Sequence, residues 1–274
     1  MNKKTIALKK YLKDNKSYLL PACHDPLSAK LIEKKKFKVA FIGGFALSSA
    51  SLGYPDASLI NQKELVDATR SICNHTNIPI IVDADTGFGG NANVYRTVKE
   101  LEISGASALV LEDQIFPKRC ALTHQVKLLN IKDAKKRILT AIKAANENKN
   151  ILVIARTDAL TYGSVNEALN RALAFEELGA NAIFITGVNS LKQIKIIRKK
   201  IKKTPLMINI TENIKFNLND VSKNKFKFAL YSQQILNGYI DSTNKTLELI
   251  KKKKIPKFNN KARHTLSLLE FEKY

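Results

Sequence analysis

Short runs of apolar and β-branched residues recur along the chain, and longer segments with a helical spacing of apolar positions separate most of them. Runs that stay apolar from end to end are typical of parallel strands that other elements cover on both faces. Eight such units predict an α/β fold, a closed (β/α)8 TIM barrel, and not an open doubly wound sheet, because no GxGxxG motif follows the first run. The predicted strands are 18–24, 39–44, 78–85, 107–114, 151–159, 181–187, 205–211 and 226–232.

Helices are predicted between the strands, and a further helix and a tail follow the eighth strand. The predicted helices are 63–73, 95–104, 133–146, 165–178 and 233–252. No linker rich in Pro, Gly or Ser interrupts the sequence, so 1–274 is interpreted as a single barrel domain, with the barrel at 18–252 and a helical tail at 258–274. The tail is expected to pack on a neighbouring subunit through its apolar residues, which are Leu266, Leu268, Leu269 and Phe271.

Charged residues stand where several predicted strands end. Asp83 and Asp85 follow one apolar run, Glu112 follows the next, and Arg156 follows the one after that. In a parallel barrel these strand ends meet on one face, which is the face where active sites form. Carboxylate oxygens without His or Cys indicate a hard cation, so the three acids predict a Mg²⁺ site, with Mn²⁺ as the alternative metal. A purely structural pairing of the acids with Arg156 is the other interpretation.

Two loops at the same face add candidate chemistry. The segment after the fourth strand carries Lys118, Arg119 and Cys120 in a row, and two neighbouring cations would favour the reactive thiolate form of a cysteine. The segment after the second strand begins with Gly43 and Gly44, whose backbone can approach an oxyanion closely.

The overall charge indicates a basic protein. The 274 residues include 46 Lys and Arg but only 24 Asp and Glu, which gives a formal net charge of +22. The lysines form runs at 33–38, 198–203 and 251–257 without interleaved aromatic residues, which favours a solvated basic surface over a nucleic-acid site. Three cysteines without a CxxC spacing, no long apolar run and no apolar leader favour a cytoplasmic protein with no membrane partner.

Several motifs together resemble the isocitrate lyase/phosphoenolpyruvate mutase superfamily, and most closely its short members of the 2-methylisocitrate lyase type. They are SLGYPD (51–56), VDADTGFG (82–89), TVKELEISGASALVLEDQ (97–114), PKRC (117–120), ARTDA (155–159) and NITE (209–212). The resemblance implies a barrel whose last helices are swapped between the subunits of a homotetramer. It also implies a Mg²⁺ ion held mostly through water, and a mobile loop that closes over the site.

The same resemblance implies roles for individual residues. The implied reaction is a Mg²⁺-dependent cleavage of a carbon–carbon bond in a small 2-hydroxy or 2-oxo carboxylate, which releases pyruvate. Cys120 would be the general acid, supported by Lys118 and Arg119, and Arg156 would bind a substrate carboxylate. The implied substrate-binding residues are Phe41, Gly43, Gly44, Asp56, Arg156, Thr186 and Asn209.

The sequence also departs from the lyase pattern. Ala121 and Leu122 follow Cys120 where the lyases have Gly-His, Phe41 replaces a tyrosine, and Thr186 replaces a glutamate. These changes favour a simpler substrate such as an oxaloacetate-like 2-oxo acid. The alternatives are a phosphonate-pathway enzyme, since Phe116–Lys118 reads FPK as in phosphoenolpyruvate mutases, and a non-enzymatic binding protein.

Overall fold

Eight parallel strands close into a barrel in chain order, and the last strand pairs with the first. The computed structural model describes residues 2–121 and 123–270. Each strand lies inside its predicted range but is shorter, because those ranges also included polar residues that already belong to the loops. The strands are β1 (Tyr18–Cys23), β2 (Ala40–Ile42), β3 (Ile80–Asp83), β4 (Ala108–Glu112), β5 (Leu152–Thr157), β6 (Ala182–Ile185), β7 (Leu206–Asn209) and β8 (Phe228–Tyr231). The predicted (β/α)8 barrel is therefore confirmed.

Side chains along each strand alternate between two apolar clusters. On β4, Ala108 and Val110 belong to a cluster of strand residues inside the barrel, whereas Leu109 and Leu111 pack against residues of the surrounding helices. Both faces of the strands are thus buried at most positions, with Leu19 on β1 as an exposed exception, which explains why the runs are mainly apolar. The alternation also decides which polar side chain at a strand end points into the barrel mouth.

Helices surround the barrel, and the five predicted ones are all present with small shifts at their ends. The helices of the structure are α1 (Lys3–Lys13), α2 (Pro26–Lys34), α3 (Gly44–Leu47), α4 (Gln62–Asn74), α5 (Asn91–Ile103), α6 (Ile131–Asn148), α7 (Ala159–Tyr162), α8 (Val165–Glu177), α9 (Leu191–Lys200), α10 (Leu218–Lys223), α11 (Gln234–Lys251) and α12 (Ala262–Leu268), with a π-helical turn at Ser48–Leu52. Capping boxes begin several of these helices, for example Asn61 with Glu64 at α4.

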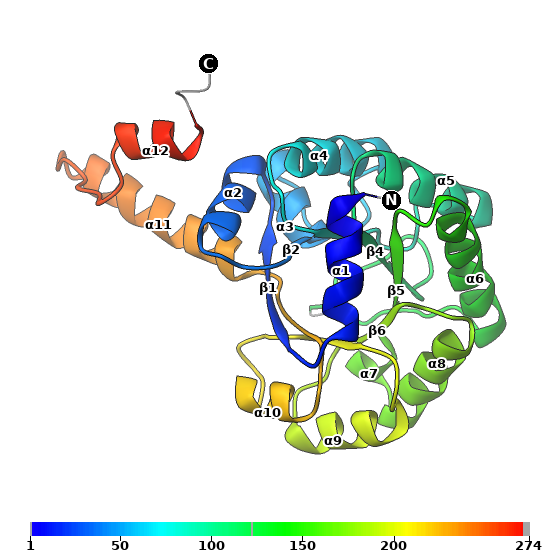
Figure 1. Ribbon diagram of the computed structural model, residues 1–274. Helices are drawn as coiled ribbons and strands as arrows, with labels where there is room; N and C mark the ends of the chain where they lie inside the picture. The colour runs from blue at the N-terminus through cyan, green and yellow to red at the C-terminus, as the bar shows by residue number, and fades with distance from the viewer. Residues whose placement is uncertain (1, 122, 271–274) are drawn as a thin grey trace.

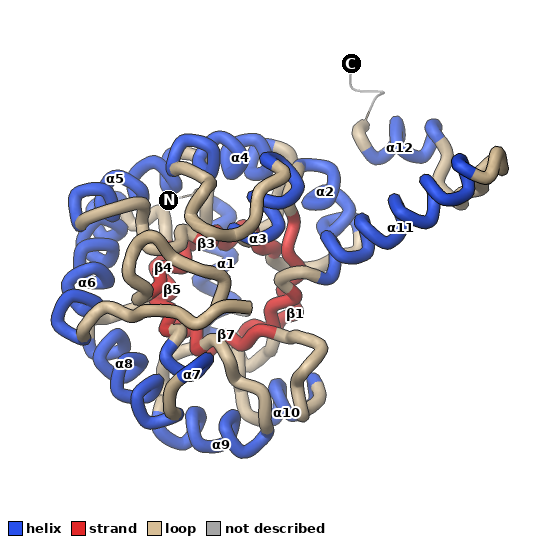
Figure 2. The backbone as a smooth tube through the Cα atoms, turned by 180° about the vertical axis from the view of Figure 1, so that it is seen from behind, coloured by secondary structure: helices blue, strands red, loops and turns tan. Residues whose placement is uncertain are grey.

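The first helix was not predicted from the sequence. In Figure 1, α1 lies across one opening of the barrel, and its fully buried Leu8 joins the cluster inside the barrel. The cluster also includes Val39, which immediately precedes β2, and Phe228, which is the first residue of β8. The amino-terminal end of the barrel is therefore closed, and the opposite end, crossed by the loops in Figure 2, is left for a site.

The last two helices extend away from the barrel. Figures 1 and 2 both show α11 and α12 as an arm that projects beyond α2. Leu236 is the one buried residue of α11, while Tyr239, Leu247 and Ile250 are more than half exposed. An arm with this much exposed apolar surface agrees with the expectation of a subunit contact, although the exchange between subunits itself stays a prediction. Phe271 of the predicted tail lies outside the described residues.

Candidate active site

The inward positions of three neighbouring strands bring acids and an arginine together at the barrel mouth. Glu112 on β4 and Arg156 on β5 are register partners, and Asp83 on β3 pairs with Val110 on β4. The Nη1 atom of Arg156 lies 3.0 Å from Oε2 of Glu112 and 3.4 Å from Oδ2 of Asp83. Asp158 completes this group, because its two oxygens accept from Nε and Nη2 of Arg156 at 2.8 and 3.0 Å.

A tight turn after β3 carries the second predicted acid. Asp85 has a left-handed backbone (φ 49°), which aspartate tolerates better than most residues. Its Oδ1 atom lies 2.9 Å from Nζ of Lys118, which also pairs with Asp56. A Cβ atom at Gly44 would stand 3.1 Å from that same Oδ1, so a glycine lets the backbone approach the acid.

Negative charge exceeds positive charge in this group. Among the described residues, Lys118 and Arg156 pair with five carboxylates, which are Asp56, Asp83, Asp85, Glu112 and Asp158. These two cations and five carboxylates are called the acid group below. Neither carboxylate oxygen of Glu112 has a hydrogen-bond partner in the described part of the chain, and Oε1 lacks an ion-pair partner too. A full complement of ionised acids would therefore leave three charges uncompensated.

Burial dominates the acid–base properties of these groups. It raises the pKa of Asp85 to about 7, and with the neighbouring carboxylates it raises the pKa of Glu112 well above its usual range. Burial, together with the charge of Asp56, also raises the pKa of Asp83. For Asp158, burial acts in the same direction, but the charge and hydrogen bonds of Arg156 outweigh it and lower the pKa.

The donor set fits a hydrated Mg²⁺ ion better than a fully protein-bound one. No group of three His, Cys, Asp or Glu side chains within residues 2–121 and 123–270 is arranged to hold a metal directly. Asp83, Asp85 and Glu112 nevertheless offer only oxygen donors, are buried and carry excess negative charge, and Glu112 has an orphaned oxygen. Mg²⁺ commonly keeps several waters and uses one or two carboxylates, so these residues suit an ion bound partly through water.

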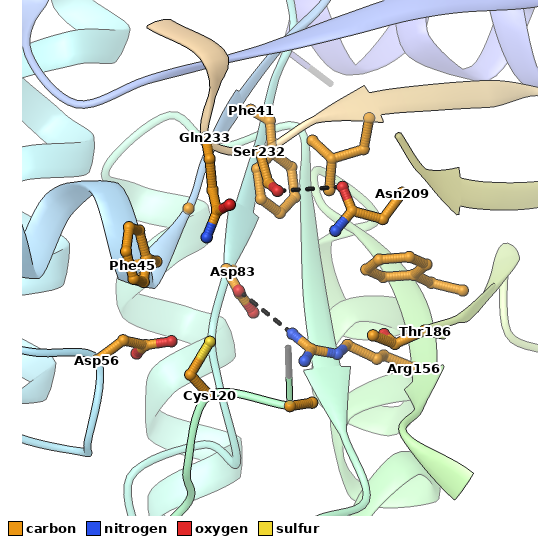
Figure 3. A pocket seen from close by; sticks show the side chains of 15 residues that line it. Phe41, Phe45, Asp56, Asp83, Cys120, Arg156, Thr186, Asn209, Ser232 and Gln233 are labelled. Atoms are coloured by element: carbon orange, nitrogen blue, oxygen red, sulfur yellow. Dashed lines mark hydrogen bonds and ion pairs between the residues drawn. The ribbon is translucent and has the colours of Figure 1, made fainter. Parts of the chain in front are cut away.

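A small cavity of about 50 Å³ opens next to the acid group (Figure 3). Its lining includes nine of the residues predicted from the sequence, which are Phe41, Gly43, Gly44, Asp56, Asp83, Cys120, Arg156, Thr186 and Asn209. Figure 3 shows the Cys120 sulfur directed towards the space between Asp83 and Arg156. A thiol, a guanidinium and two carboxylates of the acid group thus line the same small cavity.

The remaining predicted site residues lie outside the cavity lining. Lys118 is buried and turned into the acid group, so its charge is engaged by Asp56 and Asp85 and not directed at the thiol. Arg119 is exposed, and its backbone nitrogen and oxygen bond to the side chain of Gln114. His124 in the same loop is exposed, and its Nδ1 atom lies 2.8 Å from the Thr123 hydroxyl oxygen. Leu122 lies outside the described residues.

Sequence reasoning missed several residues of the cavity. Phe184 on β6 and Ser232 just after β8 occupy inward positions, so the alternation of the strands could have identified them. The Ser232 hydroxyl donates to Oδ1 of Asn209 at 3.0 Å, and the guanidinium carbon of Arg156 stands 5.5 Å from the centre of the Phe184 ring. Gln233 also reaches the cavity, but it comes from a loop for which the sequence carries no periodic signal.

The basic runs lie away from this cavity. The lysines at 199–200 and 251–254 are exposed at the ends of α9 and α11, as expected for a solvated surface. Within the described residues, no helix is both long enough and apolar enough to cross a lipid bilayer.

Comparison with known proteins agrees with this architecture. The profile of the phosphoenolpyruvate phosphomutase family matches residues 8–251. The chain belongs to this family. It is 36% identical to a 2,3-dimethylmalate lyase from Eubacterium barkeri over 71% of this chain and 67% of the relative. It is also 36% identical to a 2-methylisocitrate lyase from Aeropyrum pernix over 76% of this chain and 66% of that relative.

A solved structure extends the family comparison to ligands. The phosphonopyruvate hydrolase in complex with oxalate and Mg²⁺ is 29% identical to the chain, with a TM-score of 0.89 over 100% of this chain and 96% of that chain. Family members thus include enzymes named for lyase chemistry and one named for phosphonate hydrolysis. The resemblance predicted from the motifs is confirmed, and the choice between these reactions is not decided by the family.

Proposed function

We propose that the protein is a Mg²⁺-dependent lyase that cleaves a carbon–carbon bond of a small 2-hydroxy or 2-oxo carboxylate and releases pyruvate. The observation that carries this proposal is the cavity in which the Cys120 thiol faces Arg156 and Asp83. Two of the relatives are lyases whose names specify small carboxylates, 2,3-dimethylmalate and 2-methylisocitrate. We further propose a cytoplasmic enzyme without a nucleic-acid or membrane partner, as the composition predicts.

Arg156 holds the substrate in this proposal. Its guanidinium group is fixed by two hydrogen bonds to Asp158, which leaves a defined face for a substrate carboxylate at the cavity. The backbone at Gly43 and Gly44 also lines the cavity and supports a substrate oxygen that gains negative charge. Asn209 and Thr186 provide neutral polar contacts for the rest of the molecule.

Cys120 supplies the proton that the leaving carbon needs. When the carbon–carbon bond breaks, its electron pair stays on the departing carbon, and the thiol donates its proton to that carbon and is left as a thiolate that solvent reprotonates. Asp83, Asp85 and Glu112 would hold Mg²⁺, which supplies Lewis-acid stabilisation of the developing negative oxygen when bound.

The residues of the cavity favour a 2-oxo substrate over a 2-hydroxy substrate. A 2-hydroxy acid must lose its hydroxyl proton to a base, and the ring of Phe41 stands at the cavity without any group that can accept a proton. A 2-oxo acid such as oxaloacetate needs no such base, because loss of CO₂ directly gives the pyruvate enolate, which Cys120 then protonates. Thr186 likewise offers no second charge for a longer polycarboxylate.

A substrate screen tests the proposed function. Purified protein with Mg²⁺ is incubated with 2-methylisocitrate, 2,3-dimethylmalate, oxaloacetate and phosphonopyruvate, and pyruvate, CO₂ and inorganic phosphate are measured. We expect pyruvate without phosphate, lost in excess chelator, and we expect Cys120→Ser to reduce kcat by about 10²–10⁴-fold. Wild-type turnover by the Cys120→Ser variant would contradict the role of the thiol.

Phosphonate chemistry is the second candidate, and the structural similarity to a phosphonopyruvate hydrolase favours it specifically. Lys118, the last residue of the FPK segment, is buried at the acid group, where a cation could serve a phosphonate. Release of phosphate together with pyruvate from phosphonopyruvate, with no turnover of the carboxylates, would establish this candidate and overturn the lyase proposal.

The projecting arm supports a proposal on assembly. We propose a homotetramer in which α11 and α12 pack on a neighbouring subunit, because Tyr239, Leu247 and Ile250 are exposed in the single chain. Deletion of residues 262–274 is expected to shift the protein to smaller species in analytical ultracentrifugation. A full-length chain that sediments as a monomer at micromolar concentration would contradict the proposal.

A further inference from the structure

Gln114 stands between the acid group and the loop that carries Cys120. It is 1% exposed, and its side-chain amide makes three hydrogen bonds. The Nε2 atom donates to Oδ2 of Asp158 at 2.6 Å and to the backbone oxygen of Arg119 at 3.1 Å, and the Oε1 atom accepts from the backbone nitrogen of Arg119 at 3.0 Å. Both donors and the acceptor of the amide are therefore used.

The two partners of Gln114 belong to different parts of the site. Asp158 makes the paired hydrogen bonds that orient Arg156. Arg119 immediately precedes Cys120, so fixing its backbone nitrogen and oxygen restrains the thiol. One amide thus connects the group that orients the anion-binding guanidinium with the backbone that places the proton donor.

The backbone of Gln114 is itself held in place. Nη1 of Arg137 on α6 donates to the backbone oxygens of Gln114 at 2.6 Å and Glu112 at 2.9 Å. The other side of the loop is bonded to Ser58, whose hydroxyl accepts from the backbone nitrogen of Lys118 at 2.8 Å. The loop is consequently tied to the barrel at two successive residues just before Cys120.

The chemistry of an amide is required at this position. A glutamate would place a second carboxylate against Asp158 and could not donate to Arg119. A lysine could pair with Asp158 but could not accept from the backbone nitrogen of Arg119. Only a side chain with both donors and an acceptor satisfies both partners. Position 114 therefore tolerates fewer side chains than a buried polar position that makes a single hydrogen bond.

We propose that Gln114 is a positioning residue that latches the segment 115–121 over the barrel mouth and couples the placement of Cys120 to the Arg156–Asp158 pair. Its consequence for turnover rests on the proposed function, whereas the latch itself does not. Gln114 touches no substrate in this proposal and acts through Arg119 and Asp158.

Hydrogen exchange tests the latch without any substrate. Backbone amide exchange of the segment 115–121 is measured by mass spectrometry in the full-length protein, in Gln114→Leu and in Gln125→Leu. Gln125 is exposed in the same loop, and its side chain has no hydrogen bond within the described residues, so it is the matched control. We expect exchange in this segment to rise by about tenfold or more in Gln114→Leu and to stay at the wild-type rate in Gln125→Leu.

The outcomes separate a latch from a general structural role. Exchange that rises equally in β4 and β5 would show a loss of fold and overturn the proposal, as would an unchanged rate in the segment 115–121. If a substrate has been found, Gln114→Leu is expected to lower kcat by about 10–100-fold with less than about a threefold change in KM, because the proton donor is displaced. If no substrate turns over, the exchange result still decides the latch, so failure of the two proposals is distinguishable.

Discussion

Glu112 and Asp113 are adjacent, both fully buried, and differ completely in their surroundings. Asp113 points towards the helices, where it accepts from the Thr157 hydroxyl at 2.7 Å, the backbone nitrogen of Asp158 at 3.2 Å and Nη1 of Arg171 at 3.2 Å. Glu112 points into the barrel mouth, and neither of its oxygens has a hydrogen bond from the described residues.

We infer from this difference that Asp113 has a structural role and Glu112 a functional one. Burial raises the pKa of both carboxyl groups, and for Glu112 burial together with the charges of Asp158 and Asp85 outweighs Arg156 and Lys118 and raises the pKa well above its usual range. A buried carboxylate without hydrogen bonds costs free energy of folding unless a ligand completes it. The outward acid is completed by the protein, whereas we propose that the inward acid binds a cation.

The largest effect is expected when the inward acid is neutralised. Glu112→Gln should lower kcat by about 10³-fold or more, since loss of transition-state charge stabilisation of this kind costs several kcal/mol. The same variant should change the free energy of unfolding by no more than about 1 kcal/mol, because Arg156 keeps Asp83 and Asp158 as partners. Steady-state kinetics and urea denaturation check both parts, and retained activity would contradict the comparison.

The opposite pattern is expected for the outward acid. Asp113→Ala removes the buried partner of Arg171. Among the described residues, Arg171 then keeps Glu167 at 2.7 Å as its one acidic partner, so the free energy of unfolding should fall by about 3 kcal/mol. Mg²⁺ binding by the fraction that remains folded should be retained. A stable Asp113→Ala protein that has lost Mg²⁺ binding would show that the two acids do not divide their roles in this way.

A smaller effect, on thiol reactivity, distinguishes Cys23 on β1 and Cys73 on α4 from Cys120 at the barrel mouth. Cys23 and Cys73 are buried among apolar residues, and burial raises the pKa of the Cys73 thiol to about 11 and raises that of Cys23 as well. At pH 7.5 both stay protonated, so iodoacetamide should modify Cys120 alone. Peptide mass spectrometry after brief labelling checks this, and equal labelling of Cys73 would contradict the packing described.

The barrel and much of its mouth were predictable because their signals are periodic. Apolar runs gave all eight strands, and acids one residue beyond such runs pointed to Asp83 and Glu112. Continuing the period-two alternation would also have distinguished Glu112 from Asp113, and it would have added Phe184 and Ser232 to the predicted cavity.

Other features depend on tertiary contacts that a pattern does not encode. The pairing of Lys118 with Asp56 joins residues far apart in the chain, so the expectation that this lysine acts on Cys120 missed its actual partners. The closure of the barrel by α1 depends on Leu8 packing with strand residues inside the barrel that are far from it in the chain. The amide of Gln114 was read only as part of a motif, because its partners come from two other segments.

Metal binding tests the central claim most directly. The wild-type chain, Glu112→Gln and the exposed control Glu248→Gln are titrated with Mn²⁺ as a probe for the Mg²⁺ site, and the free ion is counted by electron paramagnetic resonance. We expect one competable Mn²⁺ per chain in the wild type and in Glu248→Gln, and loss of that ion in Glu112→Gln. Equal binding by all three proteins, or no binding by the wild type, would contradict the assignment of the inward acids to a divalent cation.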